Sequence, residues 1–126
     1  MEIKIETGIE NQNILIVGTK DTASHYGSGS VEVLATPAMI GLMEKTCQHS
    51  VLPFLPEGYG TVGVKVDISH SRATPVGRKV ICTSLLVEVD RRRLVFEVLA
   101  EDEKGEIGKG QHERFIIDTE KFMSKL

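Results

Sequence analysis

The chain has 126 residues, of which 40% are hydrophobic and 26% are charged, and its formal net charge is −3 at pH 7. This length suits a single domain over residues 1–126 with one hydrophobic core. No apolar run approaches the roughly 20 residues of a membrane span, and no basic face dominates as in nucleic-acid-binding domains, so we expect neither membrane nor nucleic acid as a partner.

The first part of the chain predicts two short strands and a loop. Ile3–Glu6 alternates between apolar and polar residues, which predicts a strand, and it lacks the apolar core of a signal peptide, so we expect a cytoplasmic location. Asn13–Val17 predicts a second strand. Lys20–Ser30 is rich in Ser, Gly and Asp, which is typical of a loop, and a loop of this length in a compact domain is often functional.

Thr36–Leu52 is the one long helix that the sequence predicts. Thr36 is placed to cap the first free N–H groups, and Pro37 suits the first helical position. Pro53 provides the stop. Because Ala38–Met43 carries no polar side chain, we expect the helix to be buried on most sides.

Glu44 is unusual because helical spacing puts it on one face with Ile40, Cys47 and Val51. A buried carboxylate is costly unless it is paired or protonated, and either state is common at functional sites. The alternative is that Glu44 lies at the edge of the apolar stripe and reaches water. Periodicity alone leaves both interpretations open.

Four strands are predicted after the helix: Thr61–His70, Arg78–Val89, Leu94–Glu101 and Ile107–Asp118. The last two connections have hairpin length, so the strands that they join should be antiparallel neighbours. Lys121–Leu126 is expected to be a polar tail. One long helix followed by these strands predicts an α+β fold with a curved antiparallel sheet around the helix. An uncovered sheet edge would favour pairing with a second copy.

The strand Thr61–His70 alternates with a period of two, which predicts a buried face of Val62, Val64, Val66, Ile68 and His70. His70 would then point toward the same interior as Glu44. A histidine and a glutamate form a common general acid–base pair, and Thr36 adds a hydroxyl at the mouth of the helix. The alternative is that His70 is a structural histidine whose hydrogen bonds are satisfied.

Other residues with reactive side chains carry weaker signals. Cys47 and Cys82 lack metal-ligand spacing, so we expect buried thiols. The remaining histidines are scattered and predict no metal site: His25, His49 and His112. Arg91–Arg93 falls in a predicted hairpin turn, where a solvated tip is expected, although a basic spot there can also meet the phosphates of a nucleotide-bearing substrate.

Three separated groups of residues together resemble the fluoroacetyl-CoA thioesterase family of hotdog-fold proteins. They are Ala35-Thr36-Pro37 with Gly41-Leu42-Met43-Glu44, then Val66-Asp67-Ile68-Ser69-His70 with Ala73-Thr74-Pro75-Val76-Gly77, then Gly110-Gln111-His112-Glu113-Arg114. The resemblance covers about residues 31–123, in the same order and with similar spacing.

The resemblance implies a hotdog fold, in which the helix lies inside the curved sheet and two subunits pair as a homodimer with active sites at the interface. It implies the catalytic residues Thr36, Glu44 and His70 and the substrate-binding residues Gly63 and Arg114. The fluoroacetyl-specific enzyme has a phenylalanine-rich lid before its catalytic Thr, whereas Gly27–Glu32 contains no aromatic residue here. We therefore expect the chemistry of the family without its fluoroacetyl selectivity.

The sequence thus predicts a thioesterase that acts on a small acyl-CoA. Glu44 with Thr36 would attack the thioester carbonyl or activate water, and His70 would move the proton; which group is the nucleophile stays open. No metal or cofactor is expected, because CoA is part of the substrate. Two alternatives are a hotdog hydratase or dehydratase and a non-catalytic acyl-CoA-binding module.

Overall fold

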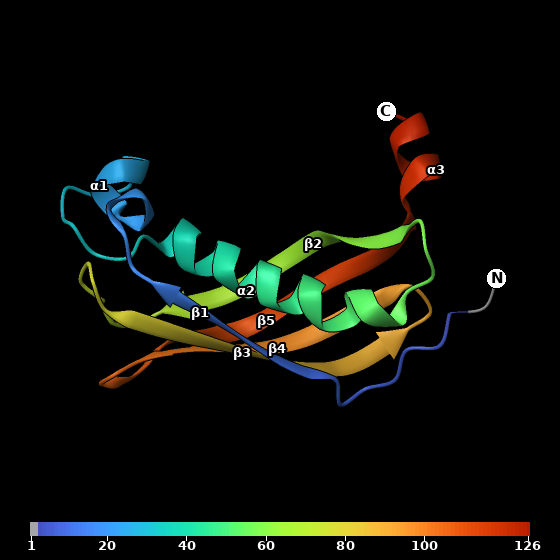
Figure 1. Cartoon of the computed structure of the whole chain (residues 1–126), viewed down its shortest axis with the longest axis horizontal. Helices are drawn as coiled ribbons and strands as arrows, with labels where there is room; N and C mark the ends of the chain where they lie inside the picture. Colours follow the sequence, from blue (N-terminus) through green and yellow to red (C-terminus); the bar gives the residue numbers. More distant parts are fainter. Residues whose placement is uncertain (1–2) are drawn as a thin grey trace.

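A five-stranded antiparallel sheet covers one long helix, α2 (Thr36–Val51), in the computed structural model, which describes residues 3–126 (Figure 1). The strands are β1 (Glu10–Ile16), β2 (Tyr59–His70), β3 (Lys79–Asp90), β4 (Arg93–Asp102) and β5 (Gly105–Asp118). This arrangement confirms the predicted α+β fold with one central helix.

Short helices lie in segments where the sequence predicted only loop or tail. The loop Lys20–Ser30 overlaps η1 (Thr19–Asp21) and contains α1 (Ala23–Tyr26), and η2 (Leu52–Phe54) follows α2. The polar tail forms most of α3 (Thr119–Ser124), which Asp118 caps by accepting the backbone N–H of Lys121. None of the helices within residues 3–126 has the length and apolar character that crossing a bilayer requires.

The strand predicted at Ile3–Glu6 is wrong. These residues pair with no strand, and Ile3 and Ile5 instead pack as partly buried side chains against the core. Alternation over so few residues is therefore explained here by burial of two isoleucines rather than by a sheet ladder.

The core lies between α2 and the inner face of the sheet. The helix contributes Met39, Met43, Cys47 and Val51, and the sheet contributes buried residues at alternate positions: Val80, Cys82, Leu86, Leu94, Phe96, Val98, Ile107 and Ile116. Each fully buried side chain of this size stabilises the fold by about 1.5–3 kcal/mol. Both cysteines are buried free thiols, as predicted.

The strand order is β1-β3-β4-β5-β2. The predicted antiparallel pairs β3–β4 and β4–β5 are confirmed. The sequence did not indicate that β2 pairs with β5 rather than with β3, its neighbour along the chain. Segment 71–78 crosses between them, which leaves β1 and β2 as the two edges of the sheet.

The predicted burial of Val62 and Val64 in β2 is wrong, and a β-bulge in this strand is the reason. The register with β5 shifts between Gly63 and Lys65, and an extra residue exchanges the faces on which side chains lie. Thr61 and Gly63 therefore point toward α2 before the bulge, where the prediction placed Val62 and Val64. Val64 is instead 57% exposed.

Candidate active site

Thr36 and His70 meet at the N-terminal end of α2, where Thr36 Oγ1 lies 2.8 Å from His70 Nδ1. The predicted cap at Thr36 is wrong. The N-cap is Ala35, so Thr36 is the first helical residue and Pro37 the second. The Thr36 hydroxyl makes no capping hydrogen bond and instead bonds to the last residue of β2. The tertiary contact between helix and strand decides the direction of this side chain.

Burial favours the neutral form of the His70 imidazole. Burial lowers its pKa below the ordinary 6.5, and an interaction with the backbone of Arg72 opposes the shift more weakly. Its Nε2 atom is buried and has no hydrogen-bond partner within residues 3–126. An unpartnered buried ring nitrogen is costly, so this atom is available to bond a substrate or a water molecule.

The Thr36–His70 pair opens into a pocket of about 330 Å³. Much of its lining is small, including Ala23, Ser28, Ala35 and Ala73. Asp102 fixes the wall that follows His70, because it accepts hydrogen bonds from Arg72 Nη2 at 2.7 Å and Thr74 Oγ1 at 2.8 Å. The pocket is therefore a preformed space for a compact group beside a hydroxyl and an imidazole.

Glu44 belongs to a second cluster, with Gly63 and Arg114. Its side chain is 42% exposed, and its Oε2 lies 4.0 Å from Nη1 of Arg114, whose side chain is 7% exposed. Glu44 thus lies at the edge of the apolar stripe and also faces a buried cation. Gly63 makes this approach possible, because a Cβ there would lie 2.9 Å from Glu44 Oε2.

Hydrogen bonds fix Arg114 in one orientation. Its Nε donates to Thr61 Oγ1 at 2.7 Å, and its Nη2 donates to the Thr61 carbonyl at 2.9 Å. Its Nη1 lies 3.1 Å from His112 Nε2, and His112 Nδ1 lies 2.8 Å from the Lys65 carbonyl. A neutral His112 that donates from Nδ1 and accepts at Nε2 satisfies both contacts. Burial lowers the pKa of His112 and so favours this neutral form.

His112 is the residue of this cluster that the sequence undervalued. It is buried and stacks on Phe96 with ring centroids 6.5 Å apart. The available signal was its position two residues before Arg114 on the same strand, which places both on one face. The sequence alone did not indicate that this shared face is the inner face of the sheet; the structure shows that it is.

The two clusters stay apart within one chain. Among residues 3–126, no hydrogen bond or ion pair joins Thr36 or His70 to Glu44, Gly63 or Arg114. Helix geometry explains the separation, because eight residues of α2 between Thr36 and Glu44 span about 12 Å. Within one chain the structure therefore contains two separate clusters, Thr36 with His70 and Glu44 with Gly63 and Arg114, rather than one Thr–Glu–His constellation.

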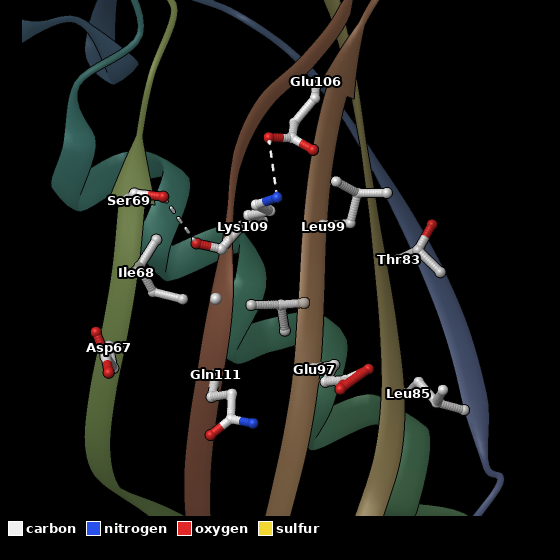
Figure 2. A pocket seen from close by; sticks show the side chains of 12 residues that line it. Asp67, Ile68, Ser69, Thr83, Leu85, Glu97, Leu99, Glu106, Lys109 and Gln111 are labelled. Atoms are coloured by element: carbon white, nitrogen blue, oxygen red, sulfur yellow. Dashed lines mark hydrogen bonds and ion pairs between the residues drawn. The ribbon is translucent and has the colours of Figure 1, made fainter.

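A broad hollow of about 750 Å³ lies on the other side of the sheet. Figure 2 shows its side chains, including Asp67, Glu97, Lys109 and Gln111, pointing away from the helix behind the strands. Lys109 is matched by Glu106 at 3.9 Å. Thr36, Glu44 and His70 do not line this hollow, so its size alone does not make it the candidate site.

A protein-family model described as fluoroacetyl-CoA-specific thioesterase matches residues 17–120. The curated fluoroacetyl-CoA thioesterase of Streptantibioticus cattleyicolor is 44% identical over 95 residues, which are 75% of this chain and 68% of that protein.

Solved structures agree with the family match. The structure of the fluoroacetyl-CoA thioesterase FlK is 37% identical with a TM-score of 0.90, over 97% of this chain and 95% of that one. A variant of FlK in complex with acetyl-CoA has a TM-score of 0.91 at 36% identity, over 96% of both chains. A Thermus thermophilus protein described as a thioesterase superfamily member is 28% identical with a TM-score of 0.89, over 97% of this chain and 90% of that one.

Proposed function

Because the chain belongs to the fluoroacetyl-CoA-specific thioesterase family, we propose that it hydrolyses the thioester bond of a small acyl-CoA. The products are the free acid and CoA. The observation that carries this proposal at the level of chemistry is the Thr36–His70 hydrogen bond of 2.8 Å at the wall of a small pocket.

His70 suits the proton transfers of this reaction. As a neutral imidazole it accepts the Thr36 hydroxyl proton at Nδ1 and carries its own hydrogen on Nε2. That Nε2–H, which has no partner within residues 3–126, can stabilise the oxyanion that forms when the carbonyl is attacked. It can then donate a proton to the departing thiolate as the C–S bond breaks.

Glu44 supplies the base in this proposal. Its carboxylate is 42% exposed, so water can reach it, and it faces Arg114 Nη1 at 4.0 Å. Glu44 takes a proton from the attacking water as the water oxygen bonds to the carbonyl carbon. After His70 has given its Nε2 proton to the thiolate, the proton held by Glu44 returns to Nε2, so both groups are regenerated. Water is the only other reactant, so no cofactor or metal enters the scheme.

We propose further that the working enzyme is a homodimer with composite sites. On the edge strand β2, Val64 is 57% exposed and Val66 is 42% exposed. An uncovered edge strand of this kind favours pairing with a second chain. A two-fold axis pairs identical edge strands antiparallel, so the start of β2 lies beside the end of β2 in the other copy. Glu44 of one protomer would then approach Thr36 and His70 of the partner subunit.

A hydrolysis screen tests the function. Free thiol release is followed with acetyl-, propionyl-, isobutyryl-, benzoyl- and fluoroacetyl-CoA, and an enoyl-CoA tests hydration by loss of its conjugated absorbance. We expect thiol release from one or more small acyl esters and no hydration. Hydration without thiol release would identify a hydratase instead, and CoA-ester binding without turnover of any ester would identify a binding module.

A further inference from the structure

A groove of about 430 Å³ lies where α3 meets β2 and β5, remote from the Thr36–His70 pocket in the same chain. Apolar side chains form part of its wall: Val62, Val64, Phe115 and Phe122. Phe115 is 43% exposed and Phe122 36%. The bulge in β2 is what turns Val62 and Val64 toward this side. Two half-exposed aromatic rings offer a surface on which a planar base can stack.

Three cations also line this groove, namely Arg92, Lys121 and Lys125. Within residues 3–126, none of the three makes an ion pair with a carboxylate. The neighbouring arginines differ, since Arg93 binds Glu88 and Glu113 at 2.7 and 2.9 Å.

Arg92 is nevertheless held in place. Its guanidinium lies 5.5 Å from the centroid of the Tyr59 ring, a cation–π distance. Among the described residues that line the groove, Asp118 is the one with a carboxylate, and it already accepts a hydrogen bond at the N-terminus of α3. Three cations against one engaged carboxylate leave the groove with an excess of positive charge.

We infer that this groove binds the 3′-phosphorylated ADP end of the CoA substrate. The inference rests on the proposed function, which supplies a ligand that carries adenine and phosphates in one molecule. Adenine stacks on Phe115 and Phe122, and the phosphates pair with Arg92, Lys121 and Lys125. The apolar wall of the groove suits the adenine ring, and the unpaired cations suit the phosphates.

The position of the groove fits this assignment. Val62 and Val64 flank Gly63, the residue against which Glu44 packs. One three-residue segment of β2 therefore borders both the groove and the cluster around Glu44. The nucleotide would bind on the outer face of β2, across the strand from the carboxylate, and the flexible pantetheine arm would pass around the strand to connect the two.

The test compares one acyl group on CoA, on dephospho-CoA and on pantetheine. In the wild type we expect KM to be lowest for the CoA ester and highest for the pantetheine ester. NaCl at 0.5 M should raise KM most for the CoA ester, less for the dephospho-CoA ester, and not for the pantetheine ester. Lys121→Gln combined with Lys125→Gln should raise KM for the CoA ester about tenfold, with kcat and the pantetheine ester unchanged. Arg92→Gln should act in the same direction.

Lys20→Gln combined with Lys79→Gln is the matched control, because it removes the same charge at exposed positions outside the groove. It should leave all three KM values unchanged. Equal KM values for the CoA and pantetheine esters, or an equal effect of both double variants, would overturn the nucleotide site while leaving hydrolysis intact. A change of oligomer mass in the groove variant alone would assign the groove to a subunit contact instead.

If no ester is hydrolysed, the proposed function fails. Calorimetric titration of CoA into the same proteins then tests separately whether the groove binds the nucleotide. Binding that weakens in Lys121→Gln/Lys125→Gln but not in the control supports the nucleotide site. Binding that is absent, or equal in both, rejects it.

Discussion

The Thr36 hydroxyl sits on the first helical residue and bonds to His70, so its loss removes one hydrogen bond near solvent and no cap. Thr36→Ala should therefore cost no more than about 0.5–1.5 kcal/mol of stability. We expect kcat to fall about 10²-fold in this variant, the lower end of the range for a lost acid–base partner. Thr36→Ser keeps the hydroxyl and should retain measurable activity. Thermal unfolding and steady-state kinetics are measured on both variants; equal turnover at a temperature where both are folded would remove Thr36 from the site.

The lowered pKa of His70 predicts a pH profile. Because the neutral imidazole is the reactive form, kcat/KM should be constant from pH 8 to about pH 6.5 and fall only at lower pH. Burial acts on stability with the same sign: the folded state disfavours the proton, so its stability is complete above pH 6.5 and decreases as the pH falls below it. Circular dichroism at each pH separates unfolding from titration. A midpoint for kcat/KM above 6.5 that disappears in His70→Ala would contradict this assignment.

The bulge is the feature at the scale of a single element that decides the site, because it turns Gly63 toward α2. In Gly63→Ala the new Cβ would lie 2.9 Å from Glu44 Oε2 and 3.1 Å from His112 Cε1. The carboxylate is the end of a flexible side chain and can move, so folding should suffer little while the base is displaced. We expect kcat to fall more than about tenfold with a small change in melting temperature.

Gly41→Ala is the stability control on the neighbouring helix. Among residues 3–126, no atom outside the adjoining turns of α2 lies within 4 Å of a Cβ at this exposed position. The substitution should therefore stabilise the protein by about 0.5–1 kcal/mol. If Gly63→Ala unfolds the protein, or keeps full kcat, the account of the bulge is wrong.

At the scale of the whole molecule, the separation of the two clusters predicts complementation between inactive chains. Glu44→Gln and His70→Ala should each lower kcat by about 10²-fold or more. A mixed dimer of the two keeps one intact composite site, with Glu44 from one chain and His70 from the other. After unfolding and refolding together, a one-to-one mixture should recover about a quarter of wild-type activity, given random pairing of two chains.

Light scattering gives the control for this experiment, since a mass near one chain of 13.9 kDa would exclude a dimer. A chain that carries both Glu44→Gln and His70→Ala is also refolded in a one-to-one mixture with wild type. The activity of this mixture shows whether the two kinds of chain pair at random. Absence of recovery in a mixture that forms dimers would place both clusters of each active site in one chain.

The sequence by itself determined the elements whose signals are local. The apolar run after Pro37 and the stop near Pro53 predicted α2 to within one residue, and the hairpin-length turns predicted how β3, β4 and β5 pair. These features depend on neighbours a few residues away, where periodicity and turn chemistry act. The motifs around Thr36, Glu44 and His70 also predicted the family before any coordinates were considered.

Only the tertiary structure decided what depends on distant partners. The Thr36 hydroxyl does not cap the helix but forms a hydrogen bond with His70, 34 positions further along the chain. Strand β2 pairs with β5 rather than with β3, the next strand along the chain. The bulge reverses which side of β2 carries Val62 and Gly63, since one inserted residue changes the phase of an alternating pattern. His112 and Arg114 orient each other beside Glu44 only because these long-range pairings bring three separate segments together. A sequence pattern read along the chain does not show which distant segments become neighbours.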